Sequence, residues 1–178
     1  GIQEMTALTS AERQLVFSQL ESYIRNFDIM LIDTAAGIST NVLFFNINAD
    51  DILLVATPEP TSITDAYAVM KVLSVGYGTS NFKLVVNSAA NEREAHDVYR
   101  QLNLVADRFL KVSIEYYGCI LMDDNVKKGV RRQKVVSAMA PLAKASRSFA
   151  ALARKVASSP APSSSGRSNK WCLTDMPL

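Results

Sequence analysis

The chain has 178 residues, of which 48% are hydrophobic and 20% are charged, and this balance suits one compact domain with a buried core. A formal net charge of +2 is too small to indicate a nucleic-acid-binding protein. The two cysteines, Cys119 and Cys172, form no CxxC pair, which argues against zinc or a disulfide framework and suits a reducing cytosol. The longest apolar run, residues 52–56, is too short to span a membrane.

The first predicted element is a helix. It begins at the capping box of residues 9–12 and carries apolar residues at helical spacing as far as Phe27. Residues 29–32 are all apolar and predict a short strand covered on both faces. This strand ends at a carboxylate, Asp33, and Gly37 follows shortly after.

Two further apolar runs, 51–56 and 82–86, predict buried strands, and a weaker strand is expected at 112–116. Helices are expected between them, one capped by residues 62–65 and one that begins at Asn91.

Pro141 is predicted to be the first residue of the last helix. The side chains of this helix that are expected to face inward are Leu142, Phe149, Leu152 and Val156.

Strands and helices therefore alternate through residues 9–157. This order predicts an α/β fold, a mostly parallel, doubly wound sheet with helices on both faces. Residues 1–157 form the predicted domain, and the Ser- and Pro-rich residues 158–178 are expected to be a flexible tail. The tail ends in an apolar cluster around Trp171, which lacks the basic face and the length of an amphipathic membrane anchor.

Polar residues follow three of the predicted strands, at Asp33, Thr57–Glu59 and Asn87. Ligands of parallel sheets bind at this carboxyl edge, so these residues predict a nucleotide site. Asp33 is suited to hold a magnesium ion directly or through water, and its alternative role is to cap the next helix or turn. The Asn87 amide both donates and accepts, as an adenine edge requires, and its alternative role is to stabilise a loop.

Three other polar features have simpler interpretations. Glu59 lies in a stiff turn, where it could instead place a negative charge near a helix N-terminus. His96, the only histidine, is interpreted as a surface residue. The basic run 127–134 is interpreted as a solvated helix face rather than a binding patch.

Several blocks of the sequence, taken together, resemble one family. They are "DIMLIDTAAGIS", "ADDILLVATPEPTSITDAYAVMKVL", "FKLVVNSAANEREAHDVYRQL", "RFLKVSIEYYGCI" and "VKKGVRRQ". They resemble the MinD/ParA-type P-loop ATPases, and within these the FlhG/FleN branch of MinD-like flagellar number regulators. The resemblance runs from Gly1 to Val156, and the block "TPEPTSITDAYA" is the part that favours this branch.

The resemblance implies a site for ATP or ADP with magnesium. Asp33 matches the switch II aspartate that holds magnesium through water, and Gly37 matches the glycine of that switch near the γ-phosphate. Glu59 and Asp65 match acidic residues near the interface of a dimer that encloses nucleotide. Asn87 matches the asparagine that recognises adenine, and the segment Ile120–Asp123 matches the loop beside the base.

The sequence departs from the family in three respects. Ala35 stands where this branch commonly has glycine, which stiffens the switch, and Leu121 stands where the base-side loop usually has proline. No glycine-rich loop with its phosphate-binding lysine occurs in the 178 residues. By the family's order of elements that loop belongs upstream of Gly1, so we expect the chain to be part of a longer protein and to hydrolyse ATP negligibly by itself.

The resemblance implies an ATP-switched enzyme that forms a homodimer and acts on a flagellar assembly protein or a flagellar transcription regulator. It implies a cytoplasmic protein with no direct nucleic-acid contact. Peripheral contact with the inner membrane stays open and has no support in the tail. The alternative is a non-catalytic protein-interaction module with a vestigial nucleotide site. A dinucleotide oxidoreductase is disfavoured because no G-x-G-x-x-G follows a predicted strand.

Overall fold

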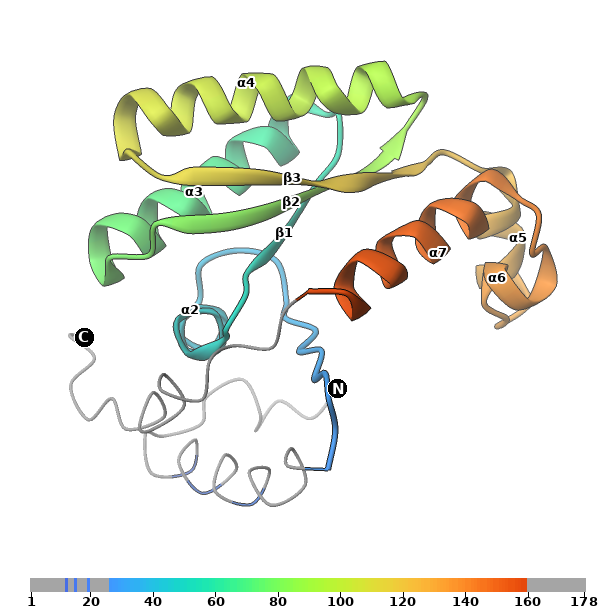
Figure 1. The fold of residues 1–178 in the computed structure, drawn as a ribbon, viewed down its shortest axis with the longest axis horizontal. Coiled ribbons are helices and arrows are strands. Elements are labelled where there is room, and N and C mark those ends of the chain that lie inside the picture. The colour runs from blue at the N-terminus through green and yellow to red at the C-terminus, as the bar shows by residue number, and fades with distance from the viewer. Residues whose placement is uncertain (1–11, 13–14, 16–18, 20–25, 160–178) are drawn as a thin grey trace. The chain divides into compact units, whose positions relative to one another are not determined.

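The computed structural model describes residues 12, 15, 19 and 26–159 (Figure 1). These residues belong to two units, one that includes the described residues up to Asp50 and one that comprises Asp51–Ser159. The predicted first helix lies outside the described residues except for Glu12, Leu15 and Gln19, which are helical. The predicted tail also lies outside them, apart from its first two residues.

The second unit contains a sheet of three parallel strands: β1 (Leu53–Ala56), β2 (Asn81–Ala89) and β3 (Ser113–Leu121). Their order in the sheet follows their order in the chain. Three of the four predicted strands are therefore confirmed. The pairing Leu54↔Leu84 and Val86↔Cys119 shows that the apolar runs align side by side.

Helices cover both faces of this sheet, as the alternation of elements predicts. α3 (Pro60–Tyr77) and α4 (Glu92–Leu110) pack against each other, α3 contacts β1, and α4 contacts β2 and β3. α7 (Lys144–Ala157) contacts β3 and lies on the opposite side of it from α4 (Figure 1). Two short helices, α5 (Asp124–Arg131) and α6 (Val136–Met139), precede α7.

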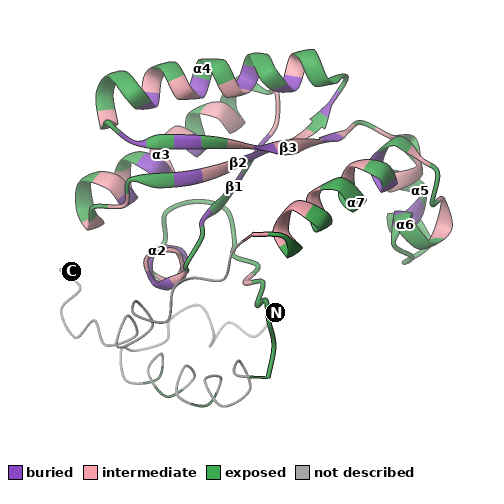
Figure 2. Ribbon diagram, in the orientation of Figure 1, coloured by how far each residue is buried: buried purple, intermediate pink, exposed green. Residues whose placement is uncertain are grey.

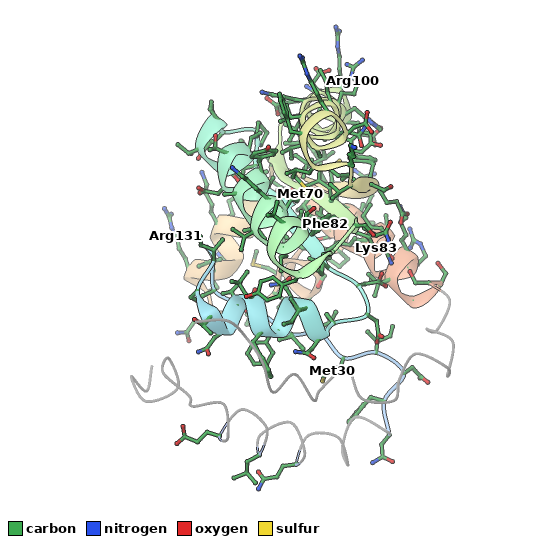
Figure 3. All side chains as sticks on the ribbon, turned by 90° about the vertical axis from the view of Figure 1, so that its left-hand side faces the viewer. Met30, Met70, Phe82, Lys83, Arg100 and Arg131 are labelled. Carbon is green, nitrogen blue, oxygen red and sulfur yellow. The ribbon has the colours of Figure 1, made fainter. Side chains whose placement is uncertain are left out.

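The core on the α3 and α4 side is made of side chains that are almost completely buried. Its helical members are the periodic apolar residues that the sequence places on one face of each helix. Figure 2 shows this buried stripe, and Figure 3 labels Met70 of α3 and Phe82 of β2. The largest buried side chains are Met70, Leu73, Leu84, Leu102 and Val86.

The core on the α7 side is smaller. Val85, Tyr117, Ile120 and Ala145 are buried together, and residues of α5 and α7 pack against them. These packing residues are Val126, Leu152 and Val156. The inward positions predicted for Leu152 and Val156 are thus confirmed, whereas those of Leu142 (85% exposed) and Phe149 (42% exposed) are wrong.

The last helix begins three residues later than the sequence predicts, which explains the error at Leu142. Pro141 lies in a turn, Ala143 is the N-cap residue, and α7 starts at Lys144. Leu142 therefore lies outside the helix. The start of α3 also differs, because Glu59 is the N-cap and Pro60 the first helical residue, whereas residues 62–65 were expected to cap it.

The strand predicted at residues 29–32 is absent, so this prediction is wrong. Residues 27–35 have no regular secondary structure, and Ile29, Met30 and Leu31 are 47%, 40% and 81% exposed. An apolar run forms a strand only where a neighbour supplies ladder hydrogen bonds, and among the described residues no strand pairs with this segment.

The first unit contains one helix that the sequence did not reveal, α2 (Thr40–Asn48). Its residues are mostly β-branched, aromatic or Asn, all weak helix formers, and its N-cap Ser39 makes no side-chain capping bond. It buries Val42, Leu43 and Phe44. The available sequence signal was the Ser-Thr pair directly before an apolar run.

The two edges of the sheet differ. Ser113 donates its N–H to Ser80 in the segment next to β2, so alternate residues of β3, Ile114 and Tyr116, direct their carbonyls outward. These carbonyls accept hydrogen bonds from Tyr99 Oη at 3.3 Å and Lys155 Nζ at 2.9 Å, respectively.

No described strand pairs with the outer edge of β1. Along this strand Leu53 is 38% and Val55 is 59% exposed, while Leu54 and Ala56 are buried. The prediction that β1 is covered on both faces is therefore wrong.

Candidate functional site

The carboxyl edge of the sheet brings together the ends of all three described strands. Ala56 pairs with Val86, and the next residue of β2, Asn87, pairs with Ile120 of β3. Neighbouring strands lie about 4.8 Å apart. The turn that contains Glu59, the amide of Asn87 and the segment that leads to Asp123 therefore start from adjacent points of one edge, where ligands of parallel sheets bind.

Asn87 is half-buried near the end of β2. Its Oδ1 accepts the backbone N–H of Ser88 at 2.9 Å. Ser88 has a positive φ of 58°, and the β2–β3 register shifts between Asn87 and Ala89. Asn87 therefore fulfils the loop-stabilising role, and its Nδ2 is a further hydrogen-bond donor.

The turn after β1 is organised by hydrogen bonds between residues that are close in sequence. Thr57 donates its backbone N–H to Ser62 Oγ at 2.9 Å, and Glu59 donates its backbone N–H to Thr57 Oγ1 at 3.4 Å. The exposed Glu59 side chain makes no capping bond to α3. Asp65 lies further along α3 and is also exposed. Both carboxylates belong to the N-terminal part of α3.

Asp123 joins two helices. Its Oδ1 accepts from the backbone N–H and side-chain Nδ2 of Asn125, both at 2.9 Å, and its Oδ2 accepts from the backbone N–H of Ala145 at 3.2 Å. It is thus the N-cap of α5 and also caps α7, whose own N-cap is Ala143. The Asn125 and Ala145 hydrogen bonds lower the pKa of Asp123 below its usual 3.8.

Asp33 and Gly37 belong to the first unit, and the other predicted site residues to the second. Asp33 is exposed in a segment without regular structure, six residues before the N-cap Ser39. Gly37 has a φ of +100°, a conformation that side chains rarely adopt, so glycine is required at this bend.

The donor set at Asp33 is compatible with magnesium bound through water. Magnesium in proteins is often held by one or two carboxylates, several waters and phosphate oxygens. Among the described residues no three His, Cys, Asp or Glu side chains gather into a metal cluster. Asp33 supplies one exposed carboxylate.

No model of a known protein family matches the chain. The chain is 39% identical to the antiactivator FleN of Pseudomonas aeruginosa over 162 residues. The matched region covers 91% of this chain and 58% of FleN. It is 30% identical to the flagellum site-determining protein YlxH of Helicobacter pylori, over 79% of this chain and 48% of YlxH. The chain thus spans about half the length of these relatives.

A similar solved structure is the MinD cell division protein of Aquifex aeolicus, with a TM-score of 0.66 and 22% identity. The similarity covers 87% of this chain and 63% of MinD. The chain belongs to the MinD/ParA-type family, in its FlhG/FleN branch. The α/β fold predicted from the sequence agrees with this MinD-like structure.

This FlhG/FleN-branch chain also has a hollow of about 470 Å³ beside β3 that the sequence did not indicate. Its walls come from the start of α4, the second half of β3 and the start of α7. They include His96, Tyr116, Cys119, Lys144 and Arg147. The rings of His96 and Tyr116 lie 4.3 Å apart. His96 is exposed, as predicted, but it belongs to an aromatic wall.

Tyr116 is protonated at neutral pH. Burial raises the pKa of its phenol, and the neighbouring Cys119 and Glu92 raise it further. The three elements of the hollow are far apart in sequence, and no motif links them. Only the fold brings His96 to the basic start of α7.

None of the described helices is both long and apolar enough to cross a bilayer.

Proposed function

We propose that this chain is part of an ATP-dependent switch that regulates the number or placement of flagella. The observation that carries this proposal is the carboxyl edge, where Glu59, Asn87 and Asp123 start from adjacent strand ends in a chain of the FlhG/FleN branch. Its relatives FleN and YlxH are an antiactivator and a flagellum site-determining protein. The partner in this proposal is a flagellar assembly protein or transcription regulator.

In this proposal the residues of the chain have distinct roles. Asp33 holds magnesium through water, and Gly37 lets the switch segment bend toward the γ-phosphate. Asn87 donates Nδ2 to the adenine edge while Ser88 holds its Oδ1. Glu59 and Asp65 lie near the second protomer of a nucleotide-bound homodimer.

The chemistry is hydrolysis of the terminal phosphate of ATP. Water attacks the γ-phosphorus, the bond to the ADP oxygen breaks, and inorganic phosphate and a proton are released. The 178 residues contain no phosphate-binding lysine loop. The proposal therefore requires such a loop from outside these residues, and the chain alone is expected to hydrolyse ATP negligibly.

A second candidate is a non-catalytic interaction module. It is favoured by the hydrogen bonds of Asp123, whose two oxygens already cap α5 and α7. Asn87 also has a loop-stabilising bond that needs no nucleotide. In this case the family's site residues are retained for stability.

The test compares this chain with one extended at Gly1 by a P-loop segment. ATP binding with magnesium is measured by calorimetry, and turnover by phosphate release. We expect turnover only in the extended chain, abolished by Asp33→Ala with much of the adenine affinity left. Asp28→Ala, at another exposed carboxylate in the same segment, is the control. Turnover that survives Asp33→Ala would show that the metal role is wrong.

The adenine role is tested separately in the extended chain. Asn87→Ala is expected to weaken ATP binding about tenfold or more, since a site built for a hydrogen bond discriminates strongly against its loss. Asn81→Ala, at the exposed start of β2, is the control. Unchanged ATP affinity of Asn87→Ala, with the fold intact by circular dichroism, would support the interaction module.

A further inference from the structure

The basic residues are concentrated at one end of the second unit. We define the cationic end as residues 124–147, which comprise α5, the loop 132–135, α6, the following turn and the first turn of α7 (Figure 1). It carries seven Lys and Arg residues and one acidic residue, Asp124. With 19 basic and 17 acidic residues in the whole chain, 12 basic and 16 acidic residues remain elsewhere. The end is therefore strongly positive and the remainder is negative.

All seven basic side chains are exposed. They are Lys127, Lys128, Arg131, Arg132, Lys134, Lys144 and Arg147. Figure 3 shows Arg131 extending away from the ribbon. In the described part of the chain, the ion pairs involve Lys83, Arg100 and Lys155, which all lie outside the cationic end. Among the described residues, none of these seven cations forms an ion pair. With Asp124 in the region and Asp123 at its border, positive charge remains in excess, and it attracts anionic groups.

Apolar side chains are exposed among these cations. Val130 and Val135 are 73% and 68% exposed, and Leu142 is 85% exposed. The first two flank Arg131 and Arg132 in the chain, and Leu142 comes just before Lys144. Exposed apolar side chains within a charged region are found on surfaces that a partner covers.

The hollow beside β3 adjoins the cationic end, because Lys144 and Arg147 line both. Its opposite wall is the pair of His96 and Tyr116 rings. A volume of about 470 Å³ lies within the range of roughly 300–1,000 Å³ that is typical of pockets for compact organic groups. An aromatic side chain can stack on such a wall while acidic neighbours contact the cations.

We propose that the cationic end docks an acidic segment of a protein partner, and that an aromatic side chain of this segment occupies the hollow. A nucleic-acid backbone would engage the cations but leave Val130, Val135 and Leu142 in water. A bilayer surface requires a broad apolar helix face. α5 has two apolar residues, and one of them, Val126, packs into the core. Val130 is therefore the single exposed apolar residue of this helix. A protein segment matches both the charge and the apolar positions.

This inference rests on the proposed function, in that it gives the chemistry of the protein partner. Its assay contains no nucleotide. A failure of the ATP switch therefore leaves the docking result unaffected, and a failure of docking leaves the hydrolysis test unaffected.

The probe is a fluorescein-labelled peptide of glutamates around one phenylalanine, and its control peptide has alanine in place of phenylalanine. Binding to the chain is measured by fluorescence anisotropy. We expect saturable binding that weakens as salt is raised and that is weaker for the alanine peptide. His96 is the only histidine, so its imidazole NMR signal reports on the hollow. It is expected to shift with the phenylalanine peptide and much less with the alanine peptide.

Two triple variants with equal loss of charge separate local docking from net charge. Lys127→Gln, Arg131→Gln and Arg132→Gln together are expected to weaken binding about tenfold or more. The control combines Lys71→Gln, Arg93→Gln and Arg108→Gln, which are exposed on α3 and α4, and is expected to change affinity less than about threefold. Circular dichroism confirms the fold of both.

An equal loss of affinity in the two triple variants would overturn the proposal, because net charge alone would then explain binding. The absence of saturable peptide binding at low salt would also overturn it. Duplex DNA and phosphatidylglycerol vesicles are competing probes, and selective binding of either one in place of the peptide contradicts a protein partner. If the His96 signal did not shift with the phenylalanine peptide, the aromatic side chain would not occupy the hollow.

Discussion

At the scale of single residues, Asp123 is a predicted site residue that also caps two helices, a role the sequence did not indicate. The family resemblance places it beside the base, whereas its hydrogen bonds hold the starts of α5 and α7. Position in the sequence indicated a polar residue after β3. It could not indicate Ala145, because the α7 contact is made across 22 residues by the tertiary fold.

The Asp123 caps predict a pH dependence of stability. The folded-state pKa lies below the ordinary 3.8, so the carboxylate contributes its full stability above that value. The contribution is lost as the pH falls through the lowered pKa. Asp123→Asn is expected to lower the free energy of unfolding at pH 7 and to reduce its fall on acidification. Urea unfolding between pH 2 and 7 checks this.

Asp124→Asn is the matched control for this variant. Asp124 is the first residue of α5, and its substitution by Asn removes the same charge. Its side chain does not accept the hydrogen bond from Ala145. It is expected to retain the acid dependence. If the two variants behaved alike, the cap from Asp123 to α7 would contribute nothing measurable.

Two glycines give opposite expectations for the same substitution. Gly118 has a φ of +143°, so Gly118→Ala is strained although no atom crowds the added carbon, and it is expected to cost about 1–3 kcal/mol. Gly76 lies within α3 with open space around it, and Gly76→Ala is expected to stabilise by about 0.5–1 kcal/mol. Chemical denaturation of both variants checks the signs. β3 is irregular here, because Leu84 pairs with Tyr116 and the next residue, Val85, pairs with Gly118. A stable Gly118→Ala protein would show that this irregularity relaxes freely.

At the scale of elements, periodicity predicted the interior helices well. The predicted Asn91 is the N-cap of α4, and its Oδ1 accepts from Glu94 N–H at 3.0 Å. The helix buries Ala95, Val98 and Leu102 at helical spacing. This accuracy reflects a strongly amphipathic sequence with its own cap. The strand predicted at residues 29–32 was wrong because a strand needs a neighbouring strand. The helix start predicted at Pro141 was wrong because Asp123, which is distant in sequence, caps the start of α7.

The buried stripe of α4 gives a direct stability prediction. Leu102 is 1% exposed, and Leu102→Ala is expected to destabilise the unit by about 2–5 kcal/mol because it leaves a cavity. Leu104, on the same helix, is 69% exposed, and Leu104→Ala is expected to change stability by less than about 0.5 kcal/mol. Urea denaturation measures both. Similar losses would contradict the assigned burial.

At the scale of the whole chain, alternation of strands and helices was sufficient to predict the class of the fold. The strand-end residues Asn87 and Glu59 followed from the rule that parallel sheets bind ligands at the carboxyl edge. The hollow could not be predicted, since His96, Tyr116 and Arg147 come from three separate elements. Their proximity is a property of tertiary packing alone.

The exposed edge at β1 leads to a prediction for the assembled molecule. Val55 is 59% exposed on an edge that no described strand pairs with, an arrangement that favours edge-to-edge association. Val55→Lys is expected to reduce self-association in size-exclusion chromatography with little loss of stability. Leu53→Lys, at the same edge, should act similarly, whereas Leu54→Lys, at a buried position, should unfold the chain. Unchanged association of Val55→Lys would exclude this edge as the contact.

The side chains of Tyr99 and Lys155 have a consequence for how this sheet can grow. They occupy the outward carbonyls of Ile114 and Tyr116, so an incoming polypeptide would have to displace both to hydrogen-bond there. At the β1 border no described strand pairs with the backbone. Among the described strands, β1 (Leu53–Ala56) is therefore the border at which a further strand can pair without displacing these two hydrogen bonds.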